Sequence, residues 1–187
     1  DYHQKALGLA EAQNIKDEAI KRSIAVSYNS MGNIYLELKE YDLALEHFNK
    51  SLKIEEDLDN KLGLAINYNN IGIIYEAKDS LDLALKSYQT SLDYNNQINS
   101  TVGKIICNNS IGSIYLKQNK PELALTTIKP TVALAEKTND KFYTGMAYIN
   151  LGWAQNELNL LDEAKPNLEK GLDIVKHDDI GQNDTNT

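Results

Sequence analysis

The sequence predicts an all-α protein, a solenoid of stacked helix-turn-helix repeats. The first observation is a glycine that recurs with a fixed period of 40 residues. The second is that an alanine follows each glycine after twelve residues, and a large apolar residue follows it after sixteen. These sets are Gly32, Ala44 and Phe48; Gly72, Ala84 and Tyr88; Gly112, Ala124 and Ile128; and Gly152, Ala164 and Leu168. A period of about 20 to 50 residues marks a repeat array, whose units must stack on one another to bury their apolar faces.

Each repeat is expected to hold two amphipathic helices. In the second repeat, apolar residues follow the i, i+3, i+4 and i+7 spacing of one helical face. They are Tyr68, Ile71, Gly72 and Tyr75 in the first helix, and Leu81, Ala84, Leu85, Tyr88 and Leu92 in the second. The polar residues Lys78, Asp79 and Ser80 between them suit a turn and an N-cap. We therefore expect helices and no strands.

In chain order, we expect helices at about 1–13, 18–38, 42–58, 61–78, 81–98, 101–118, 121–138, 141–158 and 161–175. Residues 1–13 resemble the second half of a later repeat, so we interpret the chain as a fragment of a longer array. The prediction is a single array over residues 1–176, with the half repeat at 1–13 and repeats at about 18–58, 61–98, 101–138 and 141–176. Residues 177–187 are polar without periodicity and are expected to form a disordered tail.

The recurring glycines predict a close approach of two helices. Glycine costs about 1 kcal/mol of helix propensity relative to alanine, so a glycine repeated at one site in mid-helix implies a compensating contact. We expect Gly72 to face Ala84 of the following helix. A bulky replacement of either residue is then expected to cost a few kcal/mol through overpacking.

The composition excludes several classes of partner. The formal net charge is −8 and no dense run of Lys or Arg is present, so we expect no nucleic-acid partner and no contact with an anionic membrane. No apolar stretch approaches the roughly 20 residues that span a bilayer. The single cysteine, Cys107, follows two isoleucines and is expected to be a buried structural thiol.

The repeated residues resemble the signature of the tetratricopeptide repeat. In the second repeat the matching positions are Tyr68, Ile71, Gly72, Tyr75, Ala84, Tyr88 and Ser91, and the agreement extends over roughly residues 1–176. The 40-residue period departs from the family's usual length of about 34 residues, and the proline that often closes the second helix is absent. Longer units of this kind resemble those of kinesin light chains, of Rap-type bacterial peptide-sensing regulators and of sensory arrays in bacterial signalling proteins. The resemblance implies a right-handed superhelix whose first helices line a concave, peptide-binding groove.

The face of each first helix that lies opposite the core supplies the candidate binding residues. They are Asn29, Asn33, Asn69, Asn70, Ile73, Asn109, Ser113, Asn150 and Trp153. Stacked in phase, the asparagines would form a row of Asn29, Asn69 and Asn109 beside a row of Ser30, Asn70, Ser110 and Asn150. An amide offers both a donor and an acceptor, which suits the main chain of an extended peptide. The alternative is that the asparagines cap or bridge neighbouring helices.

Two further residue sets bear on the kind of ligand. Trp153 is either an anchor for an apolar side chain of the partner or a partly buried packing residue. A set of Lys and Arg residues that would clamp a C-terminal carboxylate is not visible, which disfavours that class of ligand. The acidic run Glu55, Glu56 and Asp57 is interpreted as solvated helix surface.

Catalytic motifs are not found in the sequence. His3, His47 and His177 lie far apart, without a carboxylate or a thiol at ligand spacing, so we expect no metal site. Neither a glycine-rich phosphate loop nor a Gly-x-Ser-x-Gly elbow is present. We therefore expect no catalytic residues and no cofactor.

These observations predict a non-catalytic module that binds a protein or peptide segment. In a more specific version it is the sensory part of a larger bacterial signalling protein. The alternative is a structural or oligomerisation scaffold that self-associates through the ends of the array. A cytoplasmic location is favoured, and a periplasmic one stays open for a membrane-anchored sensor.

Overall fold

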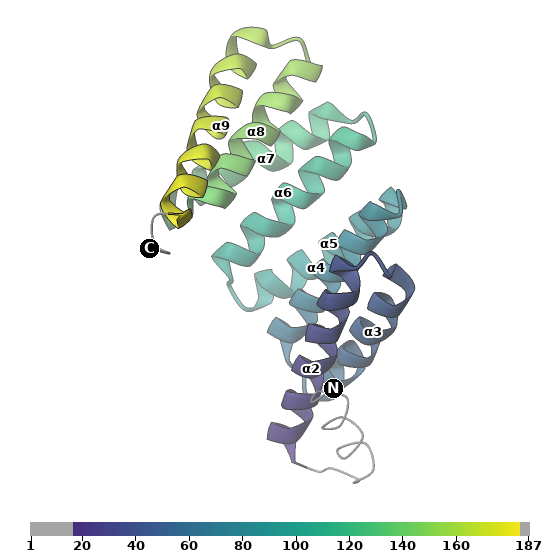
Figure 1. The fold of residues 1–187 in the computed structure, drawn as a ribbon. Coiled ribbons are helices and arrows are strands. Elements are labelled where there is room, and N and C mark those ends of the chain that lie inside the picture. The colour runs from purple at the N-terminus through teal and green to yellow at the C-terminus, as the bar shows by residue number, and fades with distance from the viewer. Residues whose placement is uncertain (1–16, 184–187) are drawn as a thin grey trace. The chain divides into compact units, whose positions relative to one another are not determined.

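The computed structural model describes residues 17–183, and every regular element in that range is a helix (Figure 1). The helices are α2 (Glu18–Glu37), α3 (Tyr41–Asp57), α4 (Lys61–Ala77), α5 (Leu81–Gln97), α6 (Thr101–Lys117), α7 (Pro121–Ala135), the short 3-10 helix η1 (Glu136–Thr138), α8 (Lys141–Glu157) and α9 (Leu161–Asn183). The predicted all-α fold of helix-turn-helix repeats is confirmed. The helix expected over residues 1–13 lies outside the described residues.

The predicted bounds of the helices from α2 to α8 differ from the observed ones by at most three residues. The last helix differs more, because α9 extends to Asn183 rather than ending near residue 175. It therefore includes residues 177–183, which the sequence placed in the tail. Residues 172–180 contain neither glycine nor proline, so no strong helix breaker stands at the expected end.

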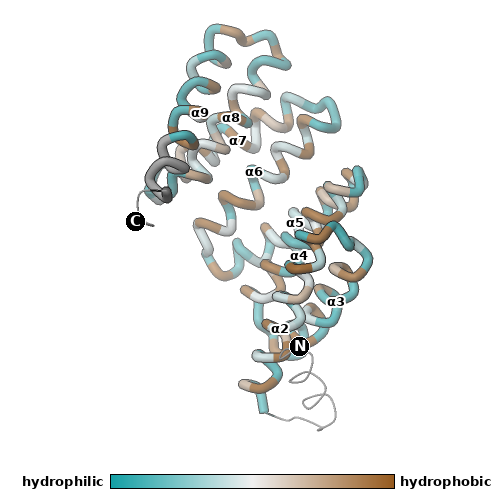
Figure 2. Tube along the Cα trace, viewed as in Figure 1, coloured by the Kyte–Doolittle hydropathy of each residue, from teal (hydrophilic) through white to brown (hydrophobic). Residues whose placement is uncertain are grey.

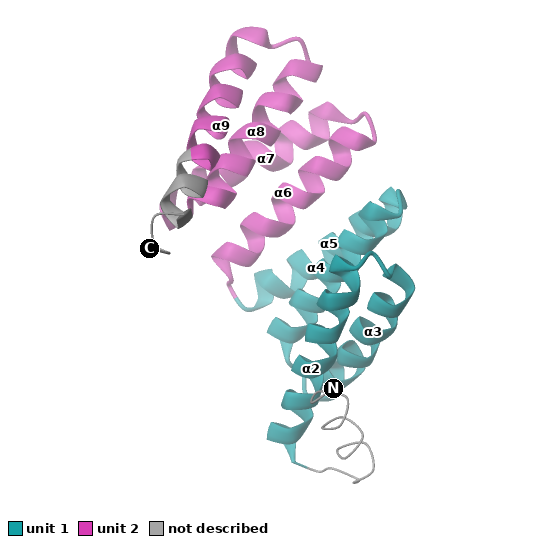
Figure 3. Cartoon of the chain, viewed as in Figure 1, with its two compact units in different colours: residues 1–98 teal, residues 99–187 magenta. Residues whose placement is uncertain are grey.

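The chain divides into two compact units, residues 1–98 and residues 99–187 (Figure 3). Unit 1 contains the hairpins α2–α3 and α4–α5, and unit 2 contains the hairpins α6–α7 and α8–α9. Within each unit the second hairpin packs on the first. That the two units form one continuous array remains a prediction.

Each unit has its own apolar core, shared between its two hairpins. In unit 1, buried residues of α3 and α4, among them Phe48 and Ile74, pack with Tyr35 of α2 and Tyr94 of α5. In unit 2, Ile128 and Tyr148 belong to a cluster that includes residues of α6, α7 and α8. Figure 2 shows apolar and polar positions interleaved along the helices, as expected for amphipathic segments. One hairpin therefore cannot bury its core without the next, which is the defining property of a repeat array.

The recurring glycines do make close contacts, and the tightest are with the large residue sixteen positions later. A Cβ placed on Gly72 would lie 2.6 Å from the ring of Tyr88, and a Cβ on Gly32 would lie 2.6 Å from the ring of Phe48. The three atoms nearest to that Cβ on Gly72 all belong to Tyr88, sixteen positions after the glycine, so Tyr88 rather than the predicted Ala84 makes the tightest contact. The large residue of the second helix lies against the glycine of the first, and its ring occupies the space that a Cβ would need.

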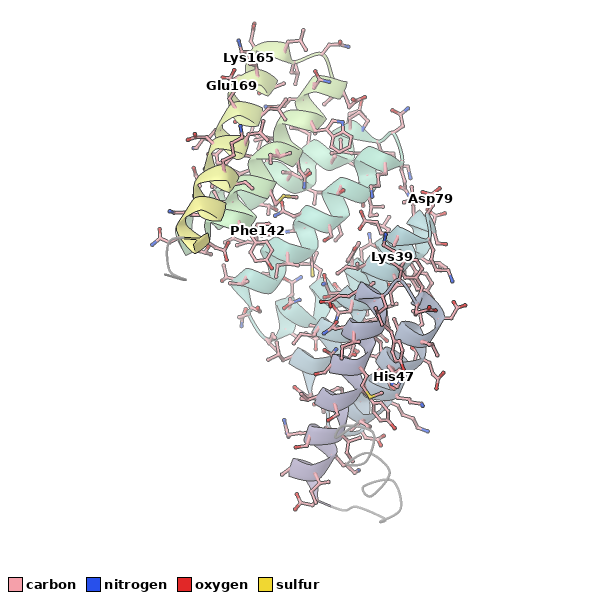
Figure 4. All side chains as sticks on the ribbon, in the orientation of Figure 1. Lys39, His47, Asp79, Phe142, Lys165 and Glu169 are labelled. Atoms are coloured by element: carbon pink, nitrogen blue, oxygen red, sulfur yellow. The ribbon has the colours of Figure 1, made fainter. Side chains whose placement is uncertain are left out.

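The turns between helices share one conformation. Seven residues, spaced 20 apart, adopt a positive φ between 46° and 61°: Lys39, Asp59, Asp79, Asn99, Asn119, Asn139 and Asn159. At the end of α4, the backbone N–H of Asp79 donates to Glu76 O and that of Ser80 donates to Tyr75 O, the paired hydrogen bonds of a Schellman motif. The left-handed region suits Asn and Asp among non-glycine residues, and Lys39 is the one exception among these seven. Figure 4 labels Lys39 and Asp79 in their turns.

This exception gives a first prediction. Lys39→Asn should raise the free energy of unfolding by about 0.5–1 kcal/mol, because asparagine tolerates the φ of 61° at this position better than lysine does. Urea denaturation followed by circular dichroism would measure the gain. The reciprocal control is Asn119→Lys, which should lower the stability by a similar amount. Equal stabilities for wild type and both variants would contradict the assignment of strain to this turn.

Candidate functional site

The first helices of unit 1, α2 and α4, carry a row of exposed apolar side chains. The exposed fractions of Val26, Leu62, Ile66 and Ile73 lie between 39% and 61%. Hydrogen bonds between side chains of α2 and α4 place the two helices side by side. We call the surface formed by the first helices of a unit its first-helix face. In unit 1 this face therefore presents apolar side chains to solvent.

Asparagines connect α2 and α4 along the same face. Asn70 Nδ2 donates to Asn33 Oδ1 at 3.1 Å, and Asn33 Nδ2 donates to Asn29 Oδ1 at 3.3 Å. Asn29 Nδ2 in turn donates to Asn67 Oδ1 at 3.1 Å. We call these four residues the asparagine ladder. It begins at the exposed Asn33 and the half-buried Asn70, and it ends at Asn67, which is 1% exposed.

The buried end of the ladder reaches the second helix. Asn67 Nδ2 donates to Ser51 Oγ at 3.0 Å and to Gly63 O at 2.9 Å, and Ser51 Oγ donates to Ala25 O at 2.9 Å. A hydrogen-bonded path thus runs from the surface of the first-helix face to the contact between α2 and α3. In the next repeat Ser91, the residue equivalent to Ser51, makes the same bond, because its Oγ donates to Ala65 O.

The structure pairs Asn29 with Asn67 and not with Asn69, which the sequence had placed in its row. Side-chain hydrogen bonds join the two first helices of unit 1 at residues 37 and 38 positions apart rather than 40. Asn69 is half-buried, and its Oδ1 is buried without a hydrogen-bond partner among the described residues. In unit 1, repeat-equivalent residues therefore do not form these hydrogen bonds; residues two or three positions earlier in the next first helix do.

In unit 2 the predicted residues divide into buried and exposed groups. Asn109 and Asn150 are buried, with Asn109 Nδ2 donating to Tyr143 O and Asn150 Nδ2 donating to Asn109 O, both at 3.3 Å. These bonds tie α6 to α8, which matches the bridging alternative for both residues. Ser113 is half-buried, whereas Trp153 is exposed. Phe142, labelled in Figure 4, is also exposed on α8 and was not among the predicted site residues.

Unit 1 also contains a pocket of about 280 Å³ on the first-helix face. It is lined by Val26, Asn29, Glu55, Asn60, Leu62, Gly63, Ile66 and Asn67. Glu55, near the end of α3, is only 4% exposed, and its Oε2 accepts a hydrogen bond from Asn60 Nδ2 at 2.7 Å. A Cβ on Gly63 would collide with the carboxylate, so this glycine is what allows Glu55 to lie against α4.

The interpretation of Glu55 as solvated surface was wrong, because the carboxylate faces the pocket rather than solvent. A departure from the repeat could have signalled this. The positions equivalent to Glu55 hold Asn95 and Ala135, and those equivalent to Asn67 hold Cys107 and Ala147. Of these junctions between repeats, only the one between the first and second repeats combines an acidic residue, a glycine and an amide at these places, so the set is not part of the general packing of the repeat.

A second polar cluster lies in unit 2, where α8 and α9 meet η1. Tyr148 hydroxyl donates to Glu136 Oε1 at 2.6 Å, and Lys170 Nζ lies 2.5 Å from the same hydroxyl and 3.2 Å from Glu136 Oε1. The hydrogen bond from Tyr148, together with Lys170, lowers the pKa of Glu136, and the contact with Tyr148 raises the pKa of Lys170. These groups satisfy one another and link three elements, which is a structural role. Glu136 and Lys170 line a pocket of about 670 Å³.

His47 is a packing residue. His47 stacks on Tyr35 with ring centroids 5.1 Å apart, and burial lowers its pKa. Among the side chains that the structure describes, no three His, Cys, Asp or Glu residues lie close enough together to hold a metal ion. Cys107 is buried, as predicted. None of the described helices combines the length and the apolar character that crossing a membrane requires.

Comparisons with known proteins agree with this architecture. A family model described as tetratricopeptide repeat matches residues 23–97, and a second model with the same description matches residues 147–174. A comparison of the sequence with curated proteins gave no match.

Several solved structures are similar in fold. BtubC (BKLC) from P. vanneervenii has a TM-score of 0.81 and 17% identity, over 95% of this chain and 72% of that one. A Rap protein complexed with Competence and Sporulation Factor has a TM-score of 0.71 and 16% identity, over 91% of this chain and 47% of that one. A signal transduction ATPase with a tetratricopeptide repeat sensor, from Pyrococcus horikoshii, has a TM-score of 0.73 and 22% identity, over 92% of this chain and 26% of that one.

The chain thus spans less than half of the Rap protein and of the ATPase. Identities of 16–22% support a shared fold and no more. The two family matches together cover more than half of the 187 residues and coincide with hairpins of the described type. The chain belongs to the tetratricopeptide repeat family.

Proposed function

We propose that this chain is a non-catalytic module that binds a peptide or an extended protein segment on its first-helix face. The observation that carries the proposal is the combination, in unit 1, of exposed apolar side chains with the asparagine ladder. Apolar side chains left in solvent beside one another are typical of an interaction surface. Amides next to them can pair with the N–H and C=O groups of an extended backbone.

We assign ligand contacts to those candidate residues whose side chains are exposed or half-buried. In unit 1, Asn33, Asn70 and Ile73 lie within reach of a ligand, and Asn70 Oδ1 accepts no hydrogen bond from a described residue. Trp153, with Phe142, offers an apolar anchor on unit 2. The buried Asn109 and Asn150 are proposed to support the face rather than to contact the ligand.

We also propose that the module is the sensory region of a larger signalling protein. Two structures of similar fold support this: a Rap protein solved with Competence and Sporulation Factor, and a signal transduction ATPase whose repeats are described as a sensor. In both, the matched part is a fraction of the whole chain.

The test is a binding measurement with a pooled library of extended peptides, using thermal melting and the fluorescence of Trp153 on the wild-type chain. The disruptive variant combines Val26→Ser with Ile66→Ser, which leaves the buried core intact. We expect it to weaken binding about tenfold or more, since anchor residues cost more than about 1 kcal/mol each when truncated.

The matched control combines Leu43→Ser with Leu83→Ser. These leucines are 42% and 48% exposed, but they lie on the second helices α3 and α5. The control should bind like the wild type. Equal loss of binding in both variants, or no binding to any peptide, would contradict the assignment of function to the first-helix face.

A second candidate function is that of a scaffold that self-associates. It is favoured by the exposed Leu161 and Leu172 on α9, whereas Leu168, at the same end, packs against Gly152. Sedimentation of the wild type and of a Leu161→Glu, Leu172→Glu variant distinguishes the two functions. A dimer that the variant abolishes, together with no peptide binding, would establish the scaffold.

A further inference from the structure

The Glu55 pocket presents a carboxylate that the described part of the chain does not neutralise. Its lining contains three apolar side chains, three asparagines and a glycine besides Glu55, and no Lys, Arg or His. Lys53, two residues before Glu55, lines a different pocket. Lys61, six residues after Glu55, lies 3.3 Å from Asp59. Burying a carboxylate away from water is costly unless a positive charge or hydrogen-bond donors compensate for it. Within the described chain, Glu55 has one such donor, Asn60.

The hydrogen bond from Asn60 leaves one carboxylate oxygen for a ligand. Asn60 Nδ2 donates to Glu55 Oε2, and Glu55 Oε1 receives no hydrogen bond from any described residue. Asn60 is itself fixed, because its backbone N–H donates to Glu55 O at 2.9 Å. The hydrogen bond to Oε2 therefore restrains the carboxylate, and Oε1, on a residue that lines the pocket, has no hydrogen-bond donor within the described chain. A preorganised acceptor of this kind favours a cationic donor.

The walls of the pocket suit the rest of such a group. Val26 of α2 and Leu62 and Ile66 of α4 line the pocket, and each is at least 45% exposed. A lysine side chain combines an aliphatic stem, which packs on apolar surface, with a compact ammonium group that has three donors. Arginine fits less well, since its planar fork pairs best with two free carboxylate oxygens and Oε2 is already engaged.

We infer that the Glu55 pocket receives a lysine side chain of the bound peptide, with the stem between Val26, Leu62 and Ile66 and the ammonium group on Glu55 Oε1. The inference rests on the proposed function and adds to it the class of side chain that the first-helix face selects. The asparagine ladder borders the pocket through Asn29 and Asn67. Peptide main chain on the ladder and a lysine in the pocket can therefore belong to one ligand.

The experiment is an NMR titration of the ¹⁵N-labelled chain with the blocked peptide acetyl-Ala-Val-Lys-Val-Ala-amide. The reporters are the side-chain amides of Asn60 and Asn67 and the backbone amide of Gly63. A peptide with norleucine in place of lysine keeps the aliphatic stem but lacks the charge. A peptide with arginine keeps the positive charge but carries it on a planar group. We expect the norleucine peptide to bind about tenfold more weakly or worse, and the arginine peptide to lie between the two.

The variant is Glu55→Gln, and its matched control is Glu56→Gln, which removes the same charge from the exposed neighbouring position. Glu55→Gln should abolish the preference for lysine over norleucine, and Glu56→Gln should leave it unchanged. Because the preference is also measured on the wild type, a folding defect in Glu55→Gln does not decide the result. Equal binding of the lysine and norleucine peptides, or no perturbation at Asn60 and Gly63, would overturn the inference. Binding of library peptides by the first-helix face in that case would leave the proposed function intact.

Discussion

Gly72→Leu should lower the free energy of unfolding by about 3 kcal/mol or more. The Cβ alone would lie 2.6 Å from the ring of Tyr88, and that ring is buried with 1% exposure. Tyr88 lacks room to retreat, because the core residues around it are close-packed. Overpacking of a core typically costs about 1–3 kcal/mol, and a whole leucine side chain here exceeds the usual extra methylene. Urea denaturation of the wild type and the variant measures the loss.

A double-mutant cycle identifies the cause. With Tyr88→Ala in the background, Gly72→Ala should become neutral or stabilising, because the ring is gone and alanine has the better helix propensity by about 1 kcal/mol. In the wild-type background the same Gly72→Ala change should be destabilising. If Gly72→Ala has the same effect in both backgrounds, the glycine is not required by contact with the ring.

The architecture could be predicted because it depends on patterns within one repeat. The 40-residue period, the helical spacing around Tyr68 and Tyr75 and the polar turn after Ala77 locate the hairpins from local information. Helices of 17 residues joined by three-residue turns then account for the period, as α4 and α5 show. The excess over a period of about 34 residues thus lies in the length of the helices and turns, not in an insertion.

The contacts across repeats could not be predicted in the same way. The 40-residue period alone suggested that Asn29 lies beside Asn69, whereas in the packed helices Asn29 is hydrogen-bonded to Asn67. The identity of the residue opposite Gly72 likewise depends on how far two helices are shifted along each other, and a one-turn error exchanges Ala84 for Tyr88. Burial of Glu55 depends on a glycine in the next helix. Each of these facts is a property of two elements together.

The exposure of the candidate site residues was predicted in part. The exposed Asn33, Ile73 and Trp153 lie on the surface where the helical wheel placed them. Asn109 and Asn150 lie on the same face of the wheel but are buried. The difference arises because the wheel distinguishes the core side of a helix from the opposite side, but not the part of the opposite side that the next repeat covers.

Asn67→Ala is expected to lower the free energy of unfolding by about 2 kcal/mol. This is expected although the equivalent residues of the following repeats are Cys107 and Ala147. The substitution removes two donated hydrogen bonds, to Ser51 Oγ and Gly63 O, and one accepted from Asn29. Gly63 O lies inside α4 and remains part of its helix, but Asn29 loses its acceptor at the half-buried contact between α2 and α4. Chemical denaturation followed by circular dichroism measures the change.

Asn33→Ala is the matched control, since Asn33 belongs to the same ladder at its exposed end. Water can replace its hydrogen bonds, so the stability should change by less than about 0.5 kcal/mol. The two variants should then differ in what they change. Asn67→Ala should lower the stability of the fold, whereas Asn33→Ala should lower the affinity for the peptide at unchanged stability. An equal loss of stability in both would show that the ladder is structural along its whole length, and the ligand would then have to bind through the apolar side chains alone.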